Sequence, residues 1–298
     1  MQGWQFRPNK QIQRLMCVEV MRRLSAFRPL SDYRYVGLGG YEFVDFDLVY
    51  RALGIRRMTS IEDRGKFERY EFNRPFSEVD IEWGSTNERL PTLALDGPLI
   101  VWLDYCCPLN KNVLQDVRLL GEKLNAGSML LVSVNADTVP DGERLANLEH
   151  RVTSERIPMD IADERHLDGW GTAAVHRRIL LDELRAGLGR RGNGPRFEQL
   201  INIHYRDTSR MQTLGGVFVD AGTEACFRAA EFRNLPHVAT GDKADLIRVP
   251  VLTAREVLAL EQKMGGSKKA PALPWMAKRD MDEFAKLHRW YPRVPAPM

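Results

Sequence analysis

Short, continuously apolar runs alternate with amphipathic segments along the first half of the chain. The runs lie at residues 33–38, 58–61, 79–83, 99–103 and 128–134. The last two, LIVWL and SMLLVSV, contain almost no polar residue, which is typical of strands buried on both faces of a parallel sheet. The pattern therefore predicts a series of βαβ units, an α/β fold with helices on both faces of the sheet.

Apolar residues at steps of three and four predict helices before, between and after these runs. The helices cover residues 9–26, 43–53, 64–72, 114–124 and 175–188. A polar and helical insertion at 141–194 follows the fifth run and contains the last of them. Beyond it, two apolar runs at 197–205 and 214–219 flank a polar turn and predict a β-hairpin.

The last quarter of the chain differs in character. Residues 247–252 look extended, and Thr253 and Glu256 form a capping box in front of a further helix. The expected divisions are a helical lead, an α/β domain and a C-terminal extension, at 1–32, 33–222 and 223–298. For the domain, the predicted fold is Rossmann-like, with a mostly parallel seven-stranded sheet that ends in an antiparallel hairpin.

Composition excludes several classes of protein. Of the 298 residues, 44% are hydrophobic and 28% are charged, which is typical of a globular chain. We expect neither a membrane span nor a signal peptide, because no long uncharged apolar run occurs and the first residues are polar and basic. The four cysteines fit no disulfide framework or zinc pattern, so we expect a cytoplasmic protein. The net charge of +3 leaves nucleic-acid binding open.

Two features at the ends of the first two runs suit a cofactor that contains a ribose. Gly37, Gly39 and Gly40 follow the first run directly, where glycines allow the backbone to approach a ligand closely. Glu62 follows the second run, about 20 residues further on, where an acidic side chain can accept hydrogen bonds from ribose hydroxyls.

Two further features follow the third and fourth runs. Ser85 and Asn87 belong to a polar loop after the third run, and Asp104 and Tyr105 open the sequence DYCCPL after the fourth. In this order, and with the hairpin behind them, the four features resemble those of the class I S-adenosylmethionine-dependent methyltransferases, whose sheet ends in a reversed seventh strand. The chain also resembles methyltransferase-like proteins of bacteria, some of them encoded near mobile or defence genes.

This resemblance implies a cofactor and the residues that hold it. S-adenosylmethionine would be bound through Gly37, Gly39, Gly40, Glu62, Ser85 and Asn87. Two positions depart from the family pattern: Tyr35 stands where many members have an acid that holds the methionine amine, and Ser85 stands where an aspartate is common. A relocated acid, Glu42 or Asp45, could take over the first of these roles.

The resemblance also implies where the chemistry occurs. Asp104 would orient or deprotonate the acceptor, or would instead cap the next helix, and Tyr105 would stack on a planar acceptor or pack within its loop. One of the two adjacent cysteines is an alternative, covalent nucleophile of the kind that pyrimidine C5 methyltransferases use. A magnesium site formed by Asp104, Asn135 and Asp137 is a further alternative, although we expect no metal.

Basic clusters late in the chain could hold the phosphates of a nucleic acid, or could be a solvated surface. They include Arg190, Arg191, Lys268 and Lys269. The expected function is an S-adenosylmethionine-dependent methyltransferase whose acceptor, an oxygen or nitrogen atom of a small molecule or a nucleic acid, is unknown. One alternative is a catalytically inactive methyltransferase-like module that binds a protein or nucleic acid, as in a bacterial defence system. Another is a nicotinamide-dependent oxidoreductase, for which Glu42 replaces the third glycine of the fingerprint.

Overall fold

One eight-stranded sheet organises the chain in the computed structural model, which describes residues 7–161, 163–192, 194–264 and 273–291. The strand order is β3-β2-β1-β4-β5-β7-β6-β8. The strands are β1 (Arg34–Gly37), β2 (Arg57–Glu62), β3 (Val79–Trp83), β4 (Leu99–Pro108), β5 (Met129–Asn135), β6 (Arg196–Arg206), β7 (Arg210–Val219) and β8 (Asp245–Ile247). The first five are parallel, and β7 runs antiparallel to both of its neighbours, β5 and β6.

The predicted fold class is confirmed, with one strand more than the seven expected. All five apolar runs are strands, and the two runs after the insertion form the hairpin of β6 and β7. The eighth strand, β8, adds three residues in parallel to β6. The largest shift of a boundary is in β4, which continues through an irregular register between Asp104 and Pro108. The segment expected as a loop after the fourth run is therefore the end of a strand.

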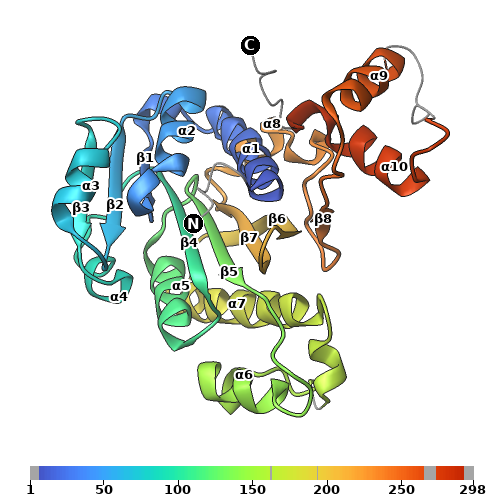
Figure 1. Cartoon of the computed structure of the whole chain (residues 1–298). Helices are drawn as coiled ribbons and strands as arrows, with labels where there is room; N and C mark the ends of the chain where they lie inside the picture. The colour runs from blue at the N-terminus through green and yellow to red at the C-terminus, as the bar shows by residue number, and fades with distance from the viewer. Residues whose placement is uncertain (1–6, 162, 193, 265–272, 292–298) are drawn as a thin grey trace.

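Helices cover both faces of this sheet (Figure 1). They are α1 (Pro8–Arg22), α2 (Val44–Leu53), α3 (Phe67–Asn73), α4 (Thr86–Arg89), α5 (Lys111–Lys123), α6 (Arg144–Val152), α7 (Gly171–Gly189), α8 (Glu224–Ala229), α9 (Ala254–Met264) and α10 (Lys278–Leu287). In the described ranges, no helix combines the length and the apolar character that a membrane span needs. Helices α1 and α2 share one hydrophobic core with the sheet, and α5 and α7 share another.

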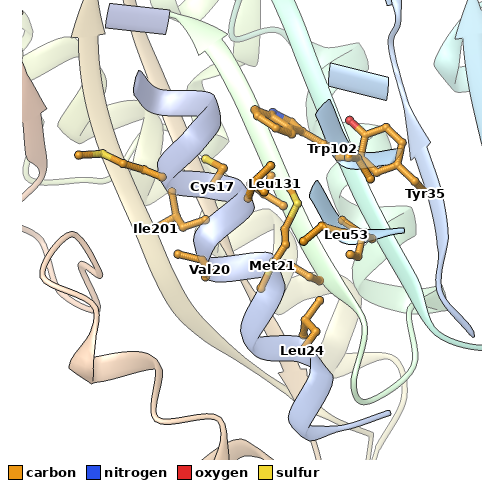
Figure 2. Close-up of a cluster of buried hydrophobic side chains, with 14 of the residues drawn as sticks. Cys17, Val20, Met21, Leu24, Tyr35, Leu53, Trp102, Leu131 and Ile201 are labelled. Atoms are coloured by element: carbon orange, nitrogen blue, oxygen red, sulfur yellow. The ribbon is translucent and has the colours of Figure 1, made fainter. Parts of the chain in front are cut away.

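The first of these cores lies beneath α1, and we call it the α1 face. Figure 2 shows Cys17 and Met21 of α1 in the same cluster as Tyr35 of β1, Trp102 of β4 and Leu131 of β5. Side chains two residues apart along a strand point to the same face of the sheet. Asp104 therefore follows Trp102 on the α1 face, and it lies at the carboxyl end of the parallel strands.

The second core, the α5–α7 face, is built mostly of aliphatic side chains. Leu120 of α5 and Leu180 and Leu184 of α7 are almost fully buried there. The two helices cross with their backbones in contact, because a Cβ at Gly187 would lie 2.2 Å from the carbonyl oxygen of Arg118. The absence of a side chain at position 187 is therefore required for this crossing.

The C-terminal helices α9 and α10 lie apart from the sheet beyond β8, and they have a small core of their own (Figure 1). Its buried members are Leu260, Leu273 and Phe284. The capping box expected before α9 is present, since the backbone N–H of Thr253 donates to Oε2 of Glu256 at 2.8 Å.

Candidate functional site

The turn after β1 is held by one carboxylate. The backbone N–H groups of Gly39 and Gly40 both donate to Oε1 of Glu62, at 2.9 and 3.0 Å, and the Ser60 hydroxyl donates to the same oxygen at 2.6 Å. Position 39 has no room for a side chain, because a Cβ there would lie 2.8 Å from the Ser60 hydroxyl oxygen. Gly40 has a φ of +58°, in the region that favours glycine. The structure thus brings two of the predicted glycines, Gly39 and Gly40, together with the predicted acid.

Glu62 lies at the carboxyl end of β2 and is 6% exposed. Burial raises the pKa of this carboxyl, and hydrogen bonds from Ser60, Tyr70 and the two glycines partly offset the effect. Next to it, the backbone N–H of Gly84 donates to the carbonyl oxygen of Glu62 at 2.9 Å. This bond places the loop after β3 beside the end of β2.

In that loop the two predicted residues have other partners. Ser85 is the N-cap of α4, where it forms a capping box with Glu88. The sequence itself contains this signal, a serine three residues before a glutamate. The Asn87 side chain donates to the carbonyl oxygen of Asn112 at 3.0 Å and to Oδ1 of Asp116 at 2.8 Å. Asn87 therefore points toward α5 and away from the glycine turn.

Tyr105 belongs to the same network. Its hydroxyl donates to Oδ2 of Asp116 at 2.6 Å, and the Thr86 hydroxyl donates to that oxygen as well. Asp116 is 1% exposed, and burial raises its pKa. Tyr105 thus packs toward the α5–α7 face, opposite to Asp104. Asp116 was not predicted as a site residue, since nothing in the local sequence indicates partners 11 to 30 residues away.

Asp104 lies in a buried ion pair with α1, a helix for which the sequence predicts no role in the site. The Lys10 Nζ lies 2.5 Å from Oδ2 of Asp104 and also donates to the Tyr205 hydroxyl at 3.0 Å. The two side chains of the ion pair are only 3% and 10% exposed. Burial alone would lower the pKa of Lys10, but the Asp104 carboxylate raises it above the ordinary lysine value.

A second ion pair lies one helical turn further along α1. The Arg14 Nε donates to Oδ1 of Asp45, which lies in the first turn of α2, directly after the glycine turn. Both side chains are at least nine-tenths buried. Tyr35, at the position where the family has an acid, is 1% exposed and packs edge-on against Phe46. One signal could have revealed Lys10 and Arg14, since they are two cations four residues apart on an amphipathic helix.

The first turn of α1 is fixed by the distant turn between β6 and β7. The backbone N–H groups of Asn9 and Lys10 donate to the two carboxylate oxygens of Asp207, at 3.1 and 3.0 Å. The Asn9 side chain in turn accepts from the backbone N–H of Val249 at 2.8 Å. These bonds hold Lys10 over the end of β4.

The sequence leaves two alternatives open at the end of β4, a cysteine nucleophile and a magnesium site. Partial burial raises the pKa of the Cys107 thiol, which opposes the thiolate that a covalent nucleophile needs, and the Cys106 side chain is exposed. Asn135 accepts from the backbone N–H of Asp137, and Asp137 accepts from the backbone N–H of Arg210. Within the described parts of the chain, no cluster of three or more His, Cys, Asp or Glu side chains could hold a metal ion.

The predicted basic surface is described only in part. Arg190 forms an ion pair with Glu122 at 2.6 Å, and Arg191 donates to the carbonyl oxygen of Leu124. Lys268 and Lys269 lie outside the described residues. Both arginines are therefore engaged with the end of α5 and the residues that follow it.

Comparison with known proteins gives a match to one family model over nearly the whole chain. The model is described as "Putative O-methyltransferase" and matches residues 3–294. No curated protein matches the sequence.

Solved structures that resemble this one are methyltransferases. The S-adenosylmethionine-dependent methyltransferase SibL is 12% identical, with a TM-score of 0.34, over 67% of this chain and 55% of its own, so the chain spans about half of SibL. Cofactor-bound Rv0187 from MTB is 16% identical over 67% of this chain and 79% of its own, with a TM-score of 0.35. The O-methyltransferase TomG from Streptomyces achromogenes is 15% identical over 67% and 78%, with a TM-score of 0.37.

Proposed function

Because the chain belongs to this O-methyltransferase family, we propose that it transfers the methyl group of S-adenosylmethionine to an oxygen atom of its acceptor, at the carboxyl ends of β1, β2 and β4. One observation carries the proposal: the Glu62 carboxylate accepts hydrogen bonds from the backbone of Gly39 and Gly40. Open α/β sheets bind their ligands at this edge, and here a glycine turn and a buried acid meet at it.

The residues at this edge suit the adenosine part of the cofactor. Glu62 would accept hydrogen bonds from the ribose hydroxyls, and the turn at Gly39 and Gly40 would let the backbone lie close to the ligand. Trp83, at the end of β3 beside Glu62, is partly exposed, and its ring would stack on the planar base. Ser85 would contribute through its backbone, since its side chain caps α4.

Asp104 is the residue that we assign to the acceptor. When bound, S-adenosylmethionine supplies a methyl group on a cationic sulfur. Asp104 holds Lys10 through Oδ2, and its Oδ1 is buried and has no hydrogen-bond partner. That oxygen would accept the proton of an acceptor hydroxyl, while Lys10 fixes the orientation of the carboxylate and burial of the pair excludes water.

An inactive module that binds no cofactor is the second candidate, and the position of Tyr35 favours it. This side chain is buried against Phe46 and provides no acid for the methionine amine. The two candidates differ in one measurable property, the binding of S-adenosylmethionine or its product S-adenosylhomocysteine.

Isothermal titration of the folded protein with S-adenosylhomocysteine tests the proposal. We expect saturable binding to one site, and we expect Glu62→Gln to weaken it at least tenfold, or about 1.4 kcal/mol, because the ribose loses a charged acceptor. The exposed Glu78→Gln, at the other end of β3, is the matched control and should bind like the wild type. A folded wild-type protein that gives no binding heat would favour the inactive module instead.

A further inference from the structure

One buried guanidinium atom of α1 has no hydrogen-bond partner within the protein. Arg14 donates through Nε to Asp45, but its Nη1 is buried and unpaired. The side chain is 5% exposed, so bulk water does not satisfy this atom. An unsatisfied buried polar group costs about 1–3 kcal/mol, and more when it is charged. Such an atom in a native fold therefore indicates a bound water or ligand.

Two carboxylates, those of Asp45 and Asp104, act on the Arg14 guanidinium. Burial would lower its pKa, but the carboxylates of Asp45 and Asp104 raise it above the ordinary arginine value. With Lys10, the group contains two cations and two carboxylates. Unpaired buried nitrogens also occur in His176 of α7, where the charged group that acts on the pKa is a cation, Arg151, and no carboxylate contributes. Only a ligand that adds no net charge leaves the group on α1 balanced.

This group adjoins the glycine turn. Trp102 pairs with Gly37 in the register between β1 and β4, and Asp104 lies two residues further along the same face. Asp45 follows the turn directly, in the first turn of α2. The Tyr35 hydroxyl lies next to Gly37, since a Cβ at Gly37 would come within 3.0 Å of it. A ligand that passes the glycine turn would therefore reach Arg14 and Asp45.

We propose that Arg14 and Asp45 bind the α-amino-acid end of S-adenosylmethionine, with Nη1 of Arg14 donating to its carboxylate and Oδ2 of Asp45 accepting from its ammonium group. This inference rests on the proposed function. A zwitterion adds one charge of each sign, so the site stays neutral, and a guanidinium matches a carboxylate in shape. Helix α1 thereby provides recognition that the position of Tyr35 does not.

Two ligands separate this role from a structural one. S-adenosylhomocysteine has the amino-acid end, whereas 5′-methylthioadenosine keeps the adenosine and lacks that end. In isothermal titration, we expect Arg14→Gln to weaken the binding of S-adenosylhomocysteine at least tenfold. The affinity for 5′-methylthioadenosine should stay within twofold of the wild-type value. Asp45→Asn should give the same pattern, and it serves if Arg14→Gln does not fold. The control is Arg22→Gln, an exposed arginine of the same helix, which should change neither affinity.

Each outcome decides a different point. If the variants bind S-adenosylhomocysteine like the wild type, or lose both ligands equally, Arg14 and Asp45 do not recognise the amino-acid end, although the proposed function stands. If the folded wild type binds neither ligand, the proposed function fails and this inference fails with it.

Discussion

The two faces of the sheet bury very different groups. The α1 face contains four charged side chains in two ion pairs, Lys10 with Asp104 and Arg14 with Asp45. The core of the α5–α7 face is largely aliphatic, and neither of its buried carboxylates pairs with a buried cation: Asp116 accepts from the Thr86 and Tyr105 hydroxyls, and Glu183 pairs with partly exposed arginines. Its buried histidine, His176, is held neutral, because burial lowers its pKa to about 3.

This difference distinguishes packing from chemistry. Taking an ion pair out of water costs several kcal/mol per ion, and apolar residues of similar volume usually pack at least as well. On the α5–α7 face the helix layer joins the sheet through apolar side chains, and the ion pairs there differ from those beneath α1, because Glu183 pairs with arginines that stay 34% and 26% exposed. We therefore interpret the charges on the α1 face as parts of the ligand site, and three experiments test that interpretation.

The largest expected effect comes from breaking a pair on the α1 face. Lys10→Met leaves the Asp104 carboxylate buried without its cation and should lower the free energy of unfolding by about 3–5 kcal/mol. The double variant Lys10→Met, Asp104→Leu should regain most of this loss, because no uncompensated charge remains. Urea unfolding at pH 7 measures both.

The exposed pair of Asp47 and Arg51 on α2 is the control. It joins residues four apart on one helix, and its side chains are 40% and 70% exposed. Arg51→Met should cost less than about 0.5 kcal/mol. If the double variant is as unstable as Lys10→Met alone, the pair is needed for packing and our distinction between the faces is wrong.

A smaller loss is expected on the other face, without any change in binding. Leu180→Ala removes a fully buried side chain of α7 and should lower the free energy of unfolding by about 2–5 kcal/mol. Because Leu180 faces away from the glycine turn, the folded variant should bind S-adenosylhomocysteine with wild-type affinity. A tenfold weaker affinity would show that the α5–α7 face also determines the ligand site.

The sequence was sufficient to predict most of the sheet and half of the candidate site. Buried parallel strands are apolar throughout, so their positions can be read from composition, and Gly39, Gly40 and Glu62 follow the strand ends directly. The extension of β4 could not be predicted, since it depends on pairing with β5 across an irregular register. Isothermal titration of Glu62→Gln with S-adenosylhomocysteine tests whether this half of the site binds the cofactor.

The other half of the site depends on long-range contacts. Asn87 and Tyr105 sit in a suitable part of the sequence, but both bond to Asp116, which only the packing of α5 brings near. Lys10 and Arg14 come from a segment expected to be a helical lead, and their partners lie 94 and 31 residues away. Local spacing contains no information about such pairs.

The smallest expected effect is a dependence on pH that originates in the α5–α7 face. The folded protein holds His176 neutral with a pKa of about 3, whereas the unfolded chain takes up a proton near pH 6.5. Stability is therefore lost as the pH falls below 6.5, by about 1.4 kcal/mol per pH unit. Between pH 7.5 and 5.0, His176 should account for about 2 kcal/mol of the decrease in the free energy of unfolding.

Urea unfolding of His176→Leu at the two pH values measures this share. The variant should show a decrease about 2 kcal/mol smaller than the wild type, while replacement of the exposed His150 by Asn should leave it unchanged. An equal decrease in His176→Leu and the wild type would mean that His176 is protonated in the folded state, and that this face buries a cation as the α1 face does.

The anchoring of α1 by Asp207 also has a consequence for how the molecule assembles. Asn9 and Asp207 are 198 residues apart, so this contact closes only after β6 and β7 have formed. During synthesis the glycine turn and the first five strands can associate early. Helix α1 can be anchored only after the hairpin of β6 and β7 has been synthesised. The residues that we assign to the acceptor and to the amino-acid end would then come together last, and a partly synthesised chain would contain the nucleotide half of the site without the half that reacts.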